Sequence, residues 1–357
     1  MKSKFIIYLL IKCFISIKAI DVSTVEELHK ALDKAKAGQV IAIAPGVYDY
    51  STYDEKLDQF KLSKDGTELN PITLRAKDPE DPPLLRGPTP KDGTILHITG
   101  NYWIVENIRI GYCHRAIVIR NGTHNIIRNV EMFSIGTKPV MLRFGASYNL
   151  FQNCYIHHTG LYNPSFGDAF DIGIPLTEST NRNQQKADYN IIERCVFKQI
   201  SSETINIREY TTGNEVIGNV FYGEGINGKN GADNFILISG SNNYIHNNVG
   251  YRNQNEYIVT AFEVKKLAED TGDGNIFENN ILFMDRPYSD IETEKRMYVV
   301  DGVDAQFSVK NNKVDYGEGF LDANSEEFYN SESVTFLEWM EKAKKKNFIK
   351  FMRVIKK

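Results

Sequence analysis

The chain has 357 residues, of which 41% are hydrophobic and 11% aromatic, and its 46 acidic residues outnumber its 42 lysines and arginines. This composition excludes a disordered chain, because a disordered chain lacks the apolar residues that a core requires. The acidic balance argues against nucleic acid as a partner, since nucleic-acid-binding domains carry a surplus of basic residues.

Residues 1–19 have the features of a secretory signal peptide, with cleavage predicted after Ala19. Lys2 and Lys4 form a basic start, and an apolar run interrupted by Lys12 follows. This run is too short to span a membrane, and an uncleaved anchor is the alternative reading. We therefore expect a secreted or extracellular protein with no membrane span.

A short amphipathic helix is predicted before the first strand. Ser23 and Glu26 have the spacing of a capping box, and Gly38 follows as a stop signal. The segment 40–48 then has the pattern of a buried strand broken by a Pro-Gly turn. Such a helix would cover the open end of a repetitive β structure, which otherwise exposes unpaired strand edges.

Two segments are predicted to lie outside the regular structure. Residues 49–70 are polar and have the character of an insertion, whereas residues 78–90 contain five prolines and are expected to form a loop. A strand is predicted between them, at residues 71–75.

A five-residue pattern with an apolar centre, usually ending on asparagine, recurs along the rest of the chain. The eight copies are residues 103–107, 125–129, 149–153, 190–194, 215–219, 243–247, 275–279 and 307–311. They start 22 to 41 residues apart, which is typical of a solenoid, and they show almost no helical periodicity. We predict an all-β fold, a single right-handed parallel β-helix over residues 20–325. A two-sheet sandwich is the alternative.

A second strand is predicted between successive copies, and its outward residues align into columns. The middle column reads Val118, Met141, Asp171, Asn206, Leu237, Glu263 and Val300. The end column reads Arg120, Arg143, Gly173, Arg208, Ser239 and Lys265, with Asp301 nearby. One outer face is therefore expected to carry polar groups at its centre and basic groups along its rim. The long segment between the copies at 149 and 190 would lie beside this face, and long loops on rigid scaffolds commonly carry function.

Three cysteines follow the predicted cleavage position, and two of them are expected to stack. Cys154 and Cys195 occupy equivalent positions of the repeat, and stacked strands lie at a spacing of about 4.8 Å, within reach of a disulfide. A disulfide and a pair of buried thiols remain equal alternatives. Cys113 is left without a partner, which argues against a disulfide scaffold.

The polar face suggests two chemistries. In β-elimination of a uronic-acid polymer, an arginine or a cation neutralises the sugar carboxylate while a base removes the neighbouring proton. In glycoside hydrolysis two carboxylates flank the bond, and Asp168 and Asp171 would be that pair. A plain solvated surface is the structural alternative.

Candidate residues follow from these chemistries. The catalytic candidates are Arg208, Lys265 and Arg143. The substrate-binding candidates are Asp168, Asn206, Glu209 and Tyr210. The candidate ligands for Ca²⁺, which prefers oxygen donors, are Asp171, Glu203 and Glu263. Otherwise no cofactor is predicted.

Residues 326–357 are predicted to form a C-terminal helix with a basic tail. An apolar stripe that includes Phe336 and Met340 precedes a lysine-rich end. The helix would cover the last coil, and the tail would be solvated or would bind an anionic surface.

The sequence resembles a known family in two regions. The stretches VIAIAPGVY and PITLRA are similar to the chondroitinase B and alginate lyase family of the pectin-lyase-like β-helix superfamily. The stretches NCYIHHTGLYNPSFGDAFDIG and ETINIREYTTGNEVIGNVFYGEGINGKNGADNFILISGSNNYIHNN are similar to a group of secreted, uncharacterised right-handed β-helix proteins.

The lyase resemblance implies a lysine base on one coil and an arginine on the next, beside acidic Ca²⁺ ligands. Here Arg208 or Glu209 stands where the lysine is expected, and the next coil has Leu237-Ile-Ser-Gly240 in place of the arginine motif. The function predicted is that of a secreted, polysaccharide-directed protein, a lyase acting on uronic-acid glycans. The alternatives are an inactive carbohydrate-binding or cell-surface protein and a structural adhesin. A monomer is expected.

Overall fold

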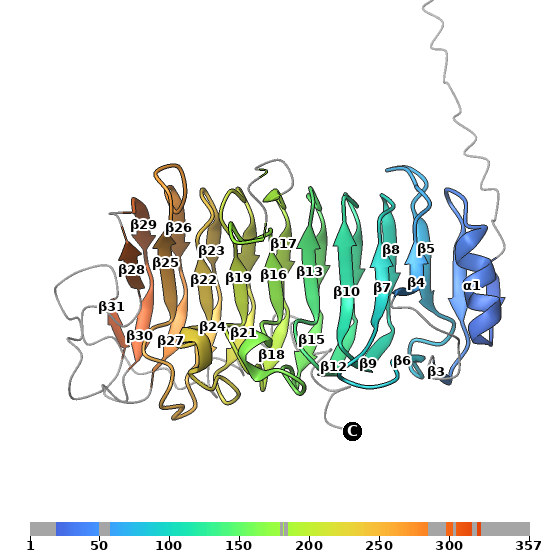
Figure 1. Cartoon of the computed structure of the whole chain (residues 1–357), viewed down its shortest axis with the longest axis horizontal. Coiled ribbons are helices and arrows are strands. Elements are labelled where there is room, and N and C mark those ends of the chain that lie inside the picture. Colours follow the sequence, from blue (N-terminus) through green and yellow to red (C-terminus); the bar gives the residue numbers. More distant parts are fainter. Residues whose placement is uncertain are drawn as a thin grey trace, which may run out of the picture.

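A computed structural model describes residues 19–49, 58–178, 181, 185–284, 298–302, 305–315 and 320–322. The predicted signal peptide and the predicted C-terminal helix lie outside these residues, apart from Ala19, and stay predictions. The described strands coil into an elongated right-handed parallel β-helix with the helix α1 (Val25–Asp33) at one end (Figure 1). This confirms the predicted fold class and excludes the sandwich.

Each full coil contributes one strand to each of three sheets. Sheet I contains β1 (Ile20–Val22), β2 (Val40–Ile43), β5 (Ile72–Ala76), β8 (Trp103–Glu106), β11 (Ile126–Arg128), β14 (Leu150–Gln152), β17 (Ile191–Glu193), β20 (Glu215–Ile217), β23 (Tyr244–His246), β26 (Asn275–Glu278) and β29 (Phe307–Lys310). Sheet II contains β4 (Asp58–Leu62), β7 (Thr94–Ile98), β10 (Arg115–Arg120), β13 (Val140–Arg143), β16 (Phe170–Ile172), β19 (Ile205–Ile207), β22 (Ile236–Ile238), β25 (Phe262–Lys266) and β28 (Tyr298–Gly302). Sheet III contains β3 (Val47–Asp49), β6 (Leu84–Arg86), β9 (Arg109–Cys113), β12 (Glu131–Ile135), β15 (Tyr155–His157), β18 (Val196–Lys198), β21 (Val220–Tyr222), β24 (Val249–Tyr251), β27 (Ile281–Phe283), β30 (Lys313–Asp315) and β31 (Phe320–Asp322).

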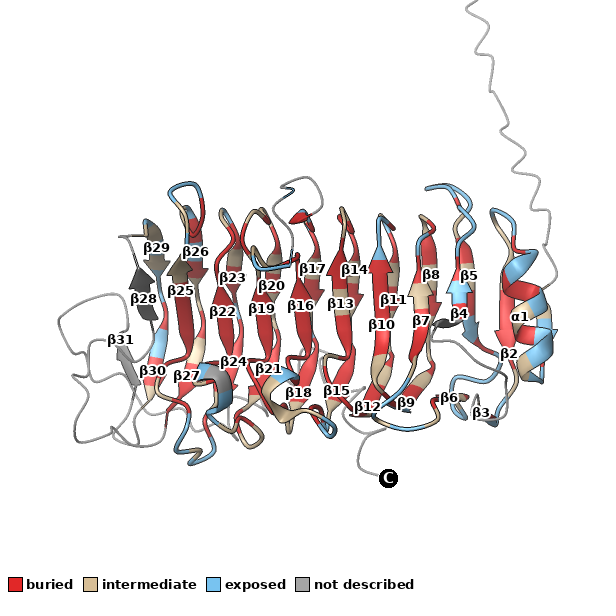
Figure 2. Ribbon diagram, in the orientation of Figure 1, coloured by how far each residue is buried: buried red, intermediate tan, exposed pale blue. Residues whose placement is uncertain are grey.

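All neighbouring strands pair in parallel except β30 and β31, which are antiparallel. The inward-pointing residues of the three sheets fill the interior of the coil, and Figure 2 shows that buried residues line its whole described length. Phenylalanines pack in sequence through the centre: Phe151 contacts Phe170, Phe170 contacts Phe197, and Phe197 stacks on Phe221 with ring centroids 5.2 Å apart. This aromatic core fixes the inner side of β16, the strand that carries Asp171.

The repeated asparagines have a physical explanation in the two turns that flank sheet I. Asn107, Asn129 and Asn153 have φ angles of 57°, 54° and 53°, a left-handed conformation that asparagine tolerates better than most residues. At the other turn, Asn190 belongs to a buried ladder of hydrogen-bonded asparagine side chains. Its Oδ1 accepts hydrogen bonds from the backbone and side chain of Asn149, and its Nδ2 donates to Asn214 Oδ1 at 3.1 Å.

Four details of the predicted repeat were wrong. Strand register aligns the fifth copy as residues 214–218, because Asn214 occupies the ladder and Gly218 the left-handed turn. Register also pairs Glu263 with Val299 and not with Val300. The predicted insertion at 49–70 contains β4, and the proline-rich loop at 78–90 contains β6. In both segments a three-to-five-residue strand is too short to show a periodicity.

The helix α1 covers one end of the coil as expected. Leu28, Ala31 and Leu32 are buried against the first strands. The capping residues differ by one position from the prediction: Thr24 accepts a hydrogen bond from the Glu27 backbone, and the Glu27 side chain accepts one from the Ser23 backbone at 2.8 Å. The described residues contain no helix long and apolar enough to cross a bilayer.

The cysteine alternatives are resolved in favour of thiols. Cys113, Cys154 and Cys195 are all buried and free. Cys154 and Cys195 stack in the column that the repeat predicts, with their sulfur atoms near backbone carbonyls.

Candidate active site

The outer face of sheet II brings residues from successive coils into three rows. Asp171 and Asn206 are direct neighbours in the central row, because β16 pairs with β19 in that register. A second row lies three residues before the centre and contains Lys138, Asp168 and Glu203 on successive coils. The third row lies two residues after the centre and contains Arg143 and Arg208. Alternation of side chains along the strand places the central and third rows on the same outer face, and the turn before each strand brings the second row to them.

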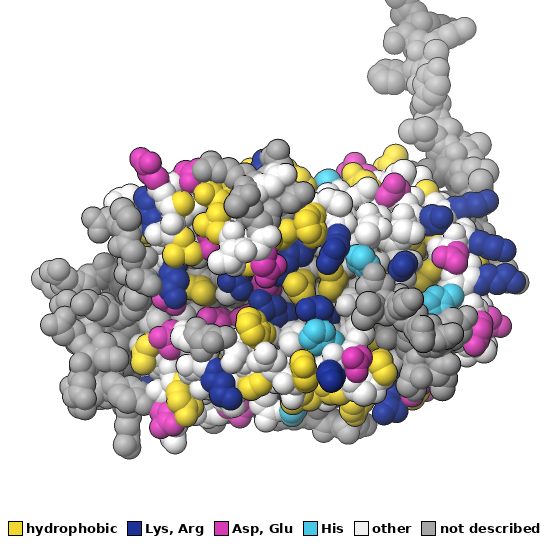
Figure 3. Space-filling view, viewed as in Figure 1, with side chains coloured by type: hydrophobic (Ala, Val, Ile, Leu, Met, Phe, Trp, Pro, Cys, Tyr) yellow, Lys and Arg dark blue, Asp and Glu magenta, His cyan; other side chains and the backbone are white. Residues whose placement is uncertain are grey.

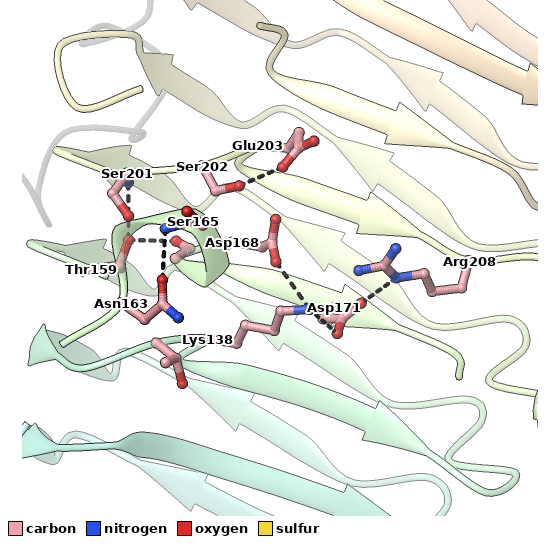
Figure 4. A network of polar contacts seen from close by, with 12 residues as sticks. Lys138, Thr159, Asn163, Ser165, Asp168, Asp171, Ser201, Ser202, Glu203 and Arg208 are labelled. Carbon is pink, nitrogen blue, oxygen red and sulfur yellow. Dashed lines mark hydrogen bonds and ion pairs between the residues drawn. The ribbon is translucent and has the colours of Figure 1, made fainter. Parts of the chain in front are cut away.

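Asp171 is the centre of the polar cluster and is completely buried. Its Oδ2 accepts hydrogen bonds from Arg143 Nη2 and from Lys138 Nζ, and the Lys138 contact is 2.5 Å long. Its Oδ1 accepts one from Arg208 Nε at 2.7 Å. Figure 4 shows Lys138 and Arg208 approaching Asp171 from opposite sides. Burial by itself raises the pKa of Asp171, but the three cations outweigh burial and hold this pKa well below its usual range.

Asp168 lies beside this cluster and behaves in the opposite way. Burial raises the pKa of Asp168, Lys138 lowers it, and the charges of Glu203 and Asp171 raise it, so that it reaches about 7. Lys138 Nζ lies 3.2 Å from Asp168 Oδ2, and Ser202 Oγ donates to Glu203 Oε2 at 2.5 Å. Asp168 can therefore exchange a proton near neutral pH, whereas Asp171 stays ionised.

The loop that precedes β16 is fixed by a network of its own. Ser201 Oγ donates to the Pro164 carbonyl at 3.0 Å, and Thr159 Oγ1 donates to the Gly167 carbonyl at 2.5 Å (Figure 4). A Cβ atom on Gly167 would lie 1.9 Å from Ser201 Oγ, so only glycine permits this close approach. The loop thereby holds Asp168 at a defined position next to Lys138.

The positive charge of this face extends beyond the cluster. When Asp168 holds its proton, the cations Lys138, Arg143 and Arg208 are balanced by the acids Asp171, Glu203 and Glu209. The preceding coil adds Arg115 and Arg120 on β10. Figure 3 shows lysine and arginine side chains gathered in the middle of this face, over the strands from β10 to β19. The whole chain has a net charge of −4, so this patch is a local feature and favours an anionic ligand.

Arg208 is the member of the cluster with the most freedom to contact a ligand. Its side chain is 21% exposed, compared with 4% for Arg143. Arg208 donates to Asp171 only through Nε, and its terminal nitrogens have no hydrogen-bond partner among the described residues. Asp171 thus orients Arg208, and the terminal N–H groups stay available to bind a ligand carboxylate through two hydrogen bonds.

Not all predicted site residues join this cluster. The structure brings together Arg143, Asp168, Asp171, Glu203 and Arg208. Lys265 and Glu263 form a separate pair, with Lys265 Nζ 3.0 Å from Glu263 Oε1 and Asn234 Nδ2 donating to Glu263 Oε2 at 2.8 Å. Because β22 lies between β19 and β25, this pair is about 10 Å from the Arg208 position.

The remaining substrate-binding candidates flank Arg208. Asn206 and Glu209 are buried, and each has one side-chain oxygen without a hydrogen-bond partner. Tyr210 is half-buried in a turn with a φ of 57°. Their predicted roles stay predictions.

The predicted calcium ligands Asp171, Glu203 and Glu263 do not form one group. Three cations already occupy the Asp171 oxygens, and Glu263 belongs to the separate pair. In the part of the chain that the structure describes, no three His, Cys, Asp or Glu side chains are placed to hold a metal ion. This arrangement does not fit Ca²⁺ at Asp171, and we derive no step through a metal.

Sequence reasoning missed Lys138, although the repeat contains the signal for it. Lys138 precedes Met141 by three residues, as Asp168 precedes Asp171 and Glu203 precedes Asn206. Asp168 and Glu203 of this row were predicted from their residue types, but aligning only the strands did not show that Lys138 shares their position in the turn before sheet II.

Exposed aromatic side chains lie next to the cluster. Tyr162 and Phe166, on the loop before β16, are 53% and 47% exposed, whereas Tyr210 and Tyr222 are half-buried. Lys138 Nζ lies 5.7 Å from the centre of the Phe166 ring. Flat apolar rings beside charged groups are suited to sugars, which present both apolar faces and polar edges.

Fold and polar face together define a polysaccharide-lyase-like right-handed β-helix protein. Residues 17–171 match the family model described as Pel9A-like, right handed beta helix region. The alginate lyase from Paenibacillus sp. str. FPU-7 is 32% identical, and the match covers 83% of this chain and 95% of that one with a TM-score of 0.75. The chain belongs to the β-helix family that includes this alginate lyase, which confirms the predicted resemblance.

More distant solved structures share the fold. Pectate lyase Pel9A is 17% identical, with a TM-score of 0.55 and coverage of 79% of this chain and 72% of that one. A rhamnogalacturonan lyase is 15% identical, with a TM-score of 0.54 and coverage of 79% and 81%. No curated protein sequence matches the chain.

Proposed function

We propose that this protein is a secreted polysaccharide lyase that cleaves a uronic-acid polymer by β-elimination at the Asp171 cluster. The observation that carries the proposal is the convergence of three acids and three cations from adjacent coils on sheet II, in a member of an alginate lyase's family. Arg208 binds the substrate carboxylate, because its terminal donors are available and it is held from behind by Asp171.

The same cluster supplies the proton transfers. Asp168 takes the proton from the carbon next to the carboxylate, the electron pair forms the carbon–carbon double bond, and the glycosidic C–O bond on the next carbon breaks. Neutralising the carboxylate acidifies that proton, and a base with a pKa of about 7 is matched to neutral pH. Lys138, 3.2 Å from Asp168, is the donor closest to this base for the departing oxygen. Arg143 keeps Asp171 in place.

We expect Arg208→Ala to lower kcat/KM on uronic-acid polymers about 10- to 100-fold, the range for losing a charged hydrogen-bond partner. The measurement is the ultraviolet absorbance of the unsaturated product on a panel of uronate polymers, with added Ca²⁺ and with a chelator. Arg75→Gln, at the exposed position of β5 in sheet I, is the control and should retain full activity.

A flat trace across the panel with retained glycan binding would replace the lyase with the inactive carbohydrate-binding protein. The exposed Tyr162 and Phe166 rings support this second candidate. A flat trace with no glycan binding would leave the structural adhesin. If wild-type and Arg208→Ala proteins cleave equally well, the site lies elsewhere.

A further inference from the structure

The coil that precedes Lys138 and Arg143 repeats their arrangement without the acid that they bind. Arg115 and Arg120 are the first and last residues of β10, and Arg120 is directly paired with Arg143 in the sheet register. Arg115 lies three residues before the central Val118, as Lys138 does before Met141. The central positions here are Val118 and Met141, which cannot neutralise charge.

These two arginines have no direct acidic partner among the described residues. Neither Arg115 nor Arg120 forms an ion pair or a side-chain hydrogen bond with any described residue, and Arg115 Nε is buried with no hydrogen-bond partner. The pKa of Arg115 is lowered, mainly by burial and then by the positive charges of Arg143 and Arg120, and the more weakly acting Asp171 and Glu178 do not offset these effects. A partly buried guanidinium with an unbonded Nε is unfavourable, because natural proteins normally give such a donor an acceptor.

An anionic ligand would supply acceptors for these donors. Arg120 lies over the Phe144 ring, with its guanidinium carbon 5.3 Å from the ring centre, and this contact restricts its side chain. Arg115 and Arg120 lie two strands from β16, where Arg208 reaches Asp171, so the two cation groups are separated by about 10 Å along the coil axis. A polymer lying along this axis would present more than one carboxylate to the face.

We propose that Arg115 and Arg120 form a second anion subsite, which binds the carboxylate of another uronate residue of the same polymer. This inference rests on the proposed function and specifies it further. The substrate is then a stretch of several uronates that runs along the axis of the β-helix, with one part at Arg208 and the part towards α1 at Arg115 and Arg120. The second subsite contributes to binding of long chains and not to the chemical step.

The test compares oligouronates of increasing length, from the disaccharide to the hexasaccharide, with Arg115→Gln, Arg120→Gln and the control Arg75→Gln. We expect each of the first two substitutions to raise KM for the hexasaccharide about tenfold and to leave kcat unchanged, because one charge-assisted contact is lost. KM for the shortest substrate that is cleaved should not change. Thermal unfolding should show little loss of stability in either variant, since neither arginine forms an ion pair with a described residue and Arg120 is exposed.

The outcomes separate this inference from the proposed function. If the wild-type protein cleaves uronates and both variants keep its KM for every length, the second subsite is wrong and the lyase stands. If the wild-type protein cleaves nothing, binding of the hexasaccharide is measured by calorimetry. A tenfold weaker Kd in both variants but not in Arg75→Gln then supports the subsite on a binding protein, and equal affinity or no binding overturns it.

Discussion

Asp171→Asn should destabilise the protein more than any other single substitution in the cluster, by about 3–5 kcal/mol at pH 7. The substitution keeps the size of the side chain but removes the buried charge that Lys138, Arg143 and Arg208 share. The three cations then repel one another, and Arg208 loses its orientation. Urea unfolding measures the free energy, and kcat/KM should fall in the fraction that still folds.

The matched control is Asp21→Asn, which removes an acid from an exposed ion pair with Lys77. Exposed pairs contribute at most about 1 kcal/mol, so this variant should remain close to the wild type. The pH dependence has a definite sign as well. The pKa of Asp171 is lowered in the folded state, so its contribution is present above the usual aspartate range and is lost as pH falls below it. A loss of less than about 1 kcal/mol at pH 7 would mean that the cluster does not depend on this carboxylate.

Asp168→Asn should lower kcat about 10²- to 10⁴-fold, the usual contribution of a general base. In the wild type kcat/KM should rise with pH and level off above an apparent pKa of about 7, because only the ionised carboxylate accepts a proton. The residual activity of the variant should not show this rise of kcat/KM with pH. A pH–rate profile of both proteins is the measurement. Asp188→Asn is the control, because burial also raises the pKa of Asp188, but Asp188 lies in the turn before β17, away from the cluster.

The pH dependence of the free energy of unfolding tests the raised pKa of Asp168 independently of activity. The pKa of Asp168 is raised in the folded state, so between roughly pH 4 and pH 7 the folded protein binds more protons than the unfolded chain does. Its contribution to stability is therefore full at low pH and is lost as pH rises through about 7. Relative to Asp168→Asn, the wild type should become less stable between pH 5 and pH 8. An identical pH dependence in both proteins would show that Asp168 is not perturbed.

The sequence was sufficient for the fold because the coil depends on local, repeated chemistry. Asparagines return at fixed positions since one turn requires a left-handed residue and the other a buried amide ladder. Because the asparagines recur at these positions in most full coils, the repeat can be recognised from a single sequence. The short strands β4 and β6 were missed, because they lack the asparagine pattern and are embedded in polar or proline-rich segments.

The site was predicted less completely, for a geometrical reason. Asp171, Arg143 and Arg208 were found because they occupy strand positions with period two. Lys138 lies in a turn, where no period constrains the side chain, and its contact with Asp168 and Asp171 depends on how that turn folds back. Glu263 and Lys265 align with residues of the cluster in the sequence columns. A column extends along the whole sheet, however, and two strand spacings separate this pair from Arg208.

The most direct test of the central claim is a crystal structure of the Asp168→Asn protein soaked with a uronate hexasaccharide. This variant retains Asp171 and Arg208 and is expected to bind the sugar without cleaving it. We predict that one carboxylate of the oligosaccharide contacts the terminal nitrogens of Arg208 on the outer face of sheet II, within reach of residue 168. An oligosaccharide bound on sheet I or sheet III, or on sheet II with no carboxylate at Arg208, would contradict the assignment of this face as the active site.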